Sequence, residues 1–138
     1  MRSETTGPPL LGAGARVLAS RPLDVPGLQV SLVQDGAVTY LHLRGRLGPI
    51  PSLLLPIGPV QGLSLLDPLG RLHSRSWALL WGPGPVPAHV VLSTGDLRWR
   101  LEQAVAPQAL GHLWVAAAEG AYRCATVDER PVALADRW

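Results

Sequence analysis

The sequence predicts a mainly β fold, an antiparallel β-sandwich or partly open barrel built from consecutive hairpins, with at most one or two short helices. Three dipeptides that favour two-residue hairpin turns lie between runs of β-forming residues, at Asp35-Gly36, Thr94-Gly95 and Glu119-Gly120. Glycine and proline, at 15 and 14 residues, separate these runs at regular intervals. We therefore expect about seven to nine short strands.

Length and composition indicate one folded domain. The chain has 138 residues, of which 47% are apolar and 16% charged, so it is far from the composition of disordered proteins. Its single cysteine excludes an internal disulfide. The many Leu, Ala, Gly, Pro and Arg residues, with no Lys or Phe, are typical of GC-rich coding, as in some bacteria and viruses. We expect a flexible N-terminal lead at residues 1–9 and a single β-rich domain at 10–138.

The first elements are a segment at 10–20, which could be a strand or a short helix, and a hairpin at 28–46. With Asp35-Gly36 as the loop, Val33 faces Val38 and Val30 faces Leu41. One face of this hairpin is then apolar and the other more polar, as in a half-buried hairpin. The apolar face contains Leu28, Val30, Leu32, Leu41 and Leu43, and the opposite face contains Gln29, Ser31, Tyr40 and His42.

The middle of the chain is rich in proline. Residues 48–62 contain four of them, which predicts an edge strand or a packed loop. The Asp67-Pro68-Leu69-Gly70 sequence has the residues favoured in a type I turn, so residues 63–66 and 71–80 are expected to form a hairpin. Residues 81–87 follow as a stiff loop.

Two hairpins are expected in the C-terminal half, at 88–102 and 112–127. Thr94-Gly95 as a loop places Val90 opposite Trp99, and Glu119-Gly120 places Val115 opposite Cys124. An alternative for the first of them is a helix at 96–105, started by a capping-box-like pair formed by Ser93 and Asp96. The strand is favoured, because strand phasing places Leu97, Trp99 and Leu101 on one face.

The absence of lysine excludes several enzyme classes. It removes the P-loop lysine, the Schiff-base lysine of pyridoxal enzymes and the Ser-x-x-Lys acylation site. The four histidines are spread along the chain without the spacing of a metal site. We therefore expect no catalytic set, no cofactor and no metal.

Arginines and tryptophans supply the candidate binding residues. Arginine binds phosphate in a bidentate manner, so a sheet face rich in arginine could hold single-stranded nucleic acid. The residues of this candidate nucleic-acid face are Arg44, Arg46, Arg71, Arg75, Arg98 and Arg100. Trp81, next to a Pro/Gly loop, and the final residue Trp138 are candidate anchors of a protein interface.

These observations favour a non-enzymatic binding or assembly module that acts through protein–protein contacts, with a protein partner or self-association. The alternative is a nucleic-acid-binding β-barrel that uses the arginine face, and a small enzyme with an unrecognised site is the third hypothesis. No apolar run reaches the roughly 20 residues that span a bilayer, and no secretory signal is recognised, so we expect no membrane insertion and a cytoplasmic protein.

Overall fold

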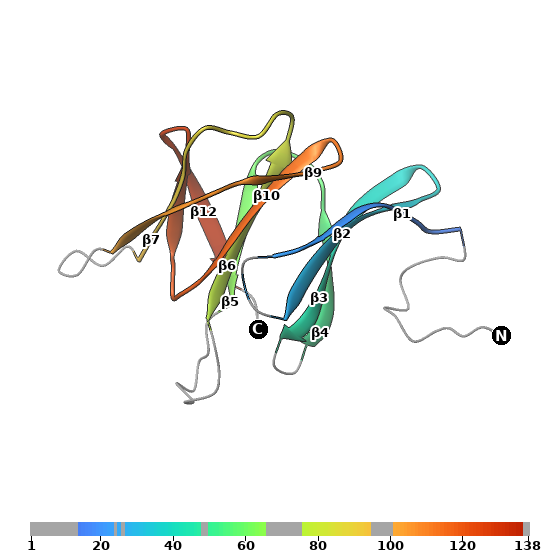
Figure 1. Cartoon of the computed structure of the whole chain (residues 1–138), viewed down its shortest axis with the longest axis horizontal. Coiled ribbons are helices and arrows are strands. Elements are labelled where there is room, and N and C mark those ends of the chain that lie inside the picture. Colours follow the sequence, from blue (N-terminus) through green and yellow to red (C-terminus); the bar gives the residue numbers. More distant parts are fainter. Residues whose placement is uncertain are drawn as a thin grey trace. The chain divides into compact units, whose positions relative to one another are not determined.

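The described residues of the computed structural model form twelve β-strands and no helix, which confirms the mainly β prediction (Figure 1). They are residues 14–23, 25, 27–47, 50–65, 76–94 and 101–136. The strand number exceeds the expected one. Contacts divide the chain into two compact units, unit 1 at residues 1–57 and unit 2 at 58–138. The single domain expected at 10–138 stays a prediction.

Unit 1 contains one four-stranded sheet in which each strand is antiparallel to the next, in the order β1-β2-β3-β4. The strands are β1 (Arg16–Pro22), β2 (Leu28–Asp35), β3 (Val38–Leu47) and β4 (Ile50–Pro56). The ambiguous segment at 10–20 is thus a strand from residue 16. The proline-rich segment at 48–62 supplies an outer strand, one of the two forms expected for it.

The β2–β3 hairpin turns one residue later than predicted. Asp35 pairs with Val38, so Gly36 and Ala37 form the turn and the Asp35-Gly36 loop is wrong. Gly36 has a φ of +64°, whereas Ala37 does not have a positive φ. A positive φ at the first central residue alone is typical of a type II′ turn, which favours glycine there.

The apolar face of this hairpin is confirmed although its register differs. Val30 pairs with Leu43 instead of the predicted Leu41, a shift of two residues. Because side chains alternate with a period of two, a shift of two keeps every side chain on its predicted face. All members of the apolar face are at most 3% exposed: Leu28, Val30, Leu32, Leu41 and Leu43.

Strand β3 bends at Gly45. The pairing of β3 with β4 shifts between Arg44 and Leu47, which marks a bulge. Gly45 has a φ of +147°, and a Cβ at this position would overlap the carbonyl oxygen of Gly27. Only glycine fits this backbone without displacing its neighbour.

Unit 2 contains one eight-stranded sheet in the order β8-β7-β11-β12-β5-β6-β10-β9. All neighbours are antiparallel except β5 and β12, which are parallel. The strands are β5 (Gln61–Leu65), β6 (Trp77–Pro83), β7 (Val90–Ser93), β8 (Glu102–Val105), β9 (Gln108–Leu110), β10 (Leu113–Glu119), β11 (Cys124–Val127) and β12 (Arg130–Asp136). Strands β5 and β6 pair as an antiparallel hairpin, as predicted, but Leu65 pairs with Trp77, so residues 66–76 separate the paired strands and the connection is longer than the expected turn. That turn, at 67–70, lies outside the described residues.

The sheet of unit 2 curls into a partly open barrel. Its two outer strands, β8 and β9, are consecutive in the chain and are separated by Ala106 and Pro107 alone. The chain therefore leaves one edge of the sheet and immediately joins the opposite edge, which requires the two edges to lie close together. The partly open barrel expected from the sequence matches this arrangement.

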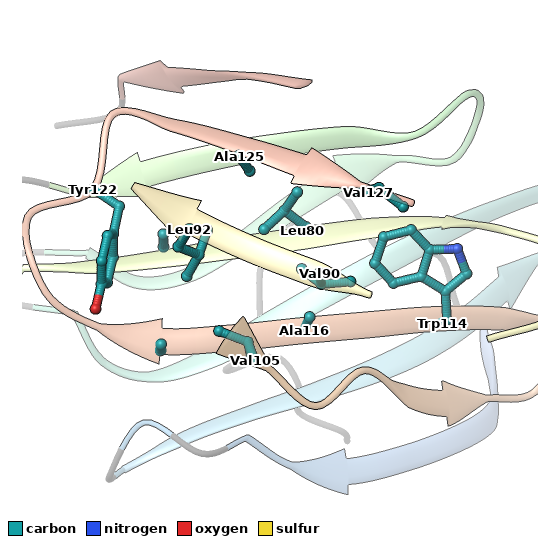
Figure 2. Close-up of a cluster of buried hydrophobic side chains, with 11 residues drawn as sticks. Leu80, Val90, Leu92, Val105, Trp114, Ala116, Tyr122, Ala125 and Val127 are labelled. Atoms are coloured by element: carbon teal, nitrogen blue, oxygen red, sulfur yellow. The ribbon is translucent and has the colours of Figure 1, made fainter. Parts of the chain in front are cut away.

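The core of unit 2 lies inside the curl (Figure 2). Trp114 is 2% exposed and is the largest of the fully buried side chains among the described residues. It pairs with Gly82 on β6, where the missing side chain leaves room for the indole ring. The remaining buried members of this cluster are Ala78, Leu80, Val90, Leu92, Val105, Ala116, Ala118, Tyr122, Ala125 and Val127.

A glycine permits the parallel contact between β5 and β12. Gly62 pairs with Leu134, and a Cβ on Gly62 would overlap the Leu134 side chain. Leu134 packs instead against the core cluster. This contact joins residues 72 positions apart in sequence, so no local turn signal could predict it.

The Thr94-Gly95 hairpin has a different register from the predicted one. Val90 pairs with Val105 and not with Trp99, and the connection reaches from Thr94 to Leu101. Residues 102–105 are therefore strand, and the helical alternative is wrong there. The reason is packing, because this register buries Val105 in the core and leaves Leu101 67% exposed.

The Glu119-Gly120 hairpin is wrong. Strand β10 pairs with β6 and β9, whereas β11 pairs with β7 and β12. Gly120 donates its N–H to the carbonyl of Ser76, and Arg123 donates to the carbonyl of Ser93, so residues 120–123 cross to another part of the sheet. Tyr122 fills the core beneath this crossing.

Candidate functional site

Strand β1 is an accessible sheet edge of unit 1. It is an outer strand of seven residues, and four of the first five side chains are exposed. Val17 is 64% exposed and Leu18 45% exposed, although large apolar side chains are usually buried. An outer strand also carries backbone N–H and C=O groups that its own sheet does not pair, which makes it a template for another strand.

The other three outer strands are less suited to pairing with a partner. Strand β4 contains Pro51 and Pro56, which have no N–H to donate. Strands β8 and β9 have four and three residues, and short edge strands are a known protection against unwanted pairing. Strand β1 has proline only at its last position, Pro22.

Strand β1 is also protected against indiscriminate pairing. Its register with β2 shifts between Val17 and Ala19, so Leu18 forms a bulge. Arg16 lies at the start of the strand, and its guanidinium donates to Oε1 of Gln34 at 2.9 Å. Bulges and charged edge residues reduce aggregation, so a partner of this edge must fit both features.

A row of polar side chains runs from β1 across β2 to β3, on the sheet face opposite the apolar face of the β2–β3 hairpin. Ser20 pairs with Ser31, and Ser31 pairs with His42. The hydroxyl oxygens of Ser20 and Ser31 are 3.0 Å apart, and Gln29 donates to the Ser20 oxygen at 2.9 Å. Ser31 and His42 are 3% and 6% exposed, so this row leads from an accessible edge to a buried imidazole.

His42 is held in its neutral form. Burial lowers the pKa of its imidazole below the ordinary value of 6.5, and the positive charge of Arg44 lowers that pKa further. Its Nε2 atom is buried and has no hydrogen-bond partner among the described residues. Protonation of His42 would therefore place a charge in an environment that does not stabilise it.

Unit 1 is expected to lose stability as the pH falls below 6.5. The pKa of His42 is lower in the folded chain than in the unfolded chain, so the unfolded chain binds the proton first and acid favours unfolding. The free energy of unfolding should fall by at most about 1.4 kcal/mol per pH unit from this one proton. Urea unfolding of the wild type and of His42→Leu between pH 7.5 and 5 measures the effect. An equal slope in both proteins would contradict the role of His42.

Two of the six arginines of the predicted nucleic-acid face lie among the described residues. Arg44 is exposed near the end of the β2–β3 hairpin, opposite Gln29, and Arg46 lies two residues further along β3. The other four arginines, Arg71, Arg75, Arg98 and Arg100, lie outside the described residues. The nucleic-acid face stays a prediction.

Of the two candidate interface tryptophans, Trp81 lies among the described residues and Trp138 does not. Trp81 lies within β6, not in a loop, and is 3% exposed. A partner could not contact its ring in this conformation. Trp138 lies outside the described residues. An interface role for either residue stays a prediction.

The sequence analysis did not identify Val17 and Leu18 as binding residues. Their position between Arg16 and Pro22 could have indicated an edge strand.

The described residues contain no group of three or more His, Cys, Asp or Glu side chains that could hold a metal ion. Cys124 is partly exposed, and its sulfur lies 3.0 Å from the hydroxyl of Ser93. No described helix is long and apolar enough to cross a membrane.

Comparison of the chain with protein-family models, with curated proteins and with solved structures gave no match.

Proposed function

We propose that this protein is a non-enzymatic binding module that acts through protein–protein contacts, and that the outer edge of β1 is its contact surface. The observation that carries the proposal is the pair of exposed apolar side chains, Val17 and Leu18, on this edge. Addition of a strand to an exposed edge is a common mode of recognition, in which the backbone supplies affinity and the side chains supply specificity.

The architecture supports a binding role in a second way. Unit 1 presents β1 on a sheet whose apolar face is at most 3% exposed at its central positions, so the edge belongs to a well-packed support. Binding to such an edge requires little rearrangement, which limits the entropy lost on association. We expect the protein to act in the cytoplasm. Its partner should then be present in a lysate of the native host.

Co-purification from the native host tests the proposal. We expect wild-type protein to retain the same partner proteins before and after nuclease treatment, and Leu18→Glu to lose at least nine-tenths of them, because a charged side chain on the edge repels an apolar partner. Leu101→Glu is the matched control, since Leu101 is also exposed, at 67%, but lies outside unit 1.

Two results would contradict the proposal. Equal recovery of partners with Leu18→Glu and with wild type would place the contact elsewhere on the chain. Loss of the whole set after nuclease treatment would favour the alternative, a nucleic-acid-binding protein that uses its arginines.

A further inference from the structure

The positive charge of the protein is concentrated in the unit that carries the β1 edge. The formal net charge is +2. Acidic and basic residues balance in residues 58–138, so residues 1–57 account for the whole excess. In the described part of the unit 1 sheet, Asp35 is the one acidic residue, and it lies at the β2–β3 turn. An acidic partner is therefore electrostatically complementary to this unit.

Arg16 provides a specific contact for such a partner. Within the described part of the chain, its hydrogen-bond partner is the uncharged amide oxygen of Gln34, so its positive charge is not neutralised there. A guanidinium has five N–H donors arranged for planar recognition, and one contact to an amide leaves donors for a carboxylate. Arg16 directly precedes Val17 and Leu18, so charge and apolar surface are adjacent on one edge.

A second copy of β1 is a poor occupant of this edge. Arg16 and Arg21 lie on either side of the bulge, and they pair with Gln34 and Val30 of β2. An antiparallel ladder between two copies, centred between Leu18 and Ala19, would place Arg16 of one copy opposite Arg21 of the other. Like charges at opposed positions destabilise a strand pair, so the charges disfavour self-pairing in this register.

We propose that the β1 edge binds an extended peptide segment that carries a carboxylate opposite Arg16 and apolar side chains beside Val17 and Leu18. This inference rests on the proposed function and names the chemistry of its partner. The carboxylate fixes the register of the added strand through the Arg16 contact. The apolar side chains of the peptide remove Val17 and Leu18 from water, which adds to the affinity that the backbone hydrogen bonds supply.

Binding of labelled peptides tests the proposal. The probes are three capped nine-residue peptides with the sequences TVTVEVTVT, TVTVQVTVT and TVTVKVTVT, measured by fluorescence anisotropy. We expect wild-type protein to bind the glutamate peptide about three-fold more tightly than the glutamine peptide and about ten-fold more tightly than the lysine peptide. Arg16→Glu should reverse this order, and Arg123→Glu, a change at an exposed arginine of unit 2, should preserve it.

Several results would overturn the proposal. It fails if no peptide binds, if all three bind equally, or if Arg16→Glu does not change their order. It also fails if binding survives in both Leu18→Glu and the milder Val17→Ser, or if wild-type protein forms a dimer that Leu18→Glu dissociates. In each of these cases the proposed function still stands if co-purified partners are lost with Leu18→Glu, so failure of the peptide proposal is distinguishable from failure of the binding role.

Discussion

Replacing Trp114 by alanine is expected to destabilise unit 2 by about 3–5 kcal/mol, the usual effect of truncating a buried tryptophan. Trp114 is 2% exposed and lies beside Val90 and Val127 in the core (Figure 2). Because Gly82 lies directly opposite, the residue paired with Trp114 on β6 has no side chain to fill the space that the indole leaves. The large expected effect follows from this lack of compensation.

Urea unfolding followed by far-UV circular dichroism measures the loss. Leu101→Ala is the control, because Leu101 is 67% exposed and should change the free energy of unfolding by less than about 0.5 kcal/mol. A change of similar size in both variants would show that Trp114 does not occupy the core described here.

Replacing Gly45 by alanine is expected to destabilise unit 1 by about 2–5 kcal/mol. Two effects add: a side chain at a φ of +147°, which costs about 1–3 kcal/mol, and overlap with the carbonyl oxygen of Gly27, which has the effect of overpacking. The overlapping atom belongs to the backbone, so it cannot rotate away as a flexible side chain would.

Gly14→Ala is the matched control for this change. A Cβ at Gly14 would have no atom within 4 Å, and its φ is not in the left-handed region. Thermal unfolding of the two variants and the wild type should therefore separate a large loss at Gly45 from almost none at Gly14. If Gly45→Ala unfolds at the wild-type temperature, the bulge in β3 does not have the described geometry.

Local patterns predicted the faces of the strands better than their pairing. The two faces of the β2–β3 hairpin were predictable because alternation of apolar and polar residues survives a shift of two residues. Its register was not, because Gly36 is the first central residue of its turn and had been placed second. The Gly111-His112 turn between β9 and β10 has the same pattern, with glycine first and a φ of +60°, and was not recognised.

Long-range pairing in unit 2 could not be predicted from turn signals. Strands β6 and β10 are buried at six consecutive positions each, and such runs are typical of central strands covered on both faces. The corresponding apolar runs, at residues 77–81 and 113–118, were visible in the sequence. The parallel contact of β5 with β12 depends on Gly62 and Leu134, whose complementarity appears only in the folded chain.

The candidate site was missed for a related reason. An edge strand has a neighbouring strand on one side only, whereas a central strand has one on each side. Amino-acid composition does not show which of the two a strand is. Arg44 was identified as a binding residue from its type, whereas Val17 and Leu18 are of interest because of their place at the outer edge of the sheet. Exposure, not residue type, distinguishes them from the buried leucines of β2 and β3.

Amide hydrogen exchange of the wild-type protein, free and in the complex eluted from the co-purification, tests the central claim most directly. An added strand would pair the outer backbone groups of β1 and slow their exchange. We predict new protection at residues 16–21, with little change at 102–136. Protection confined to 102–136, with unchanged exchange in β1, would contradict the claim that this edge is the binding surface.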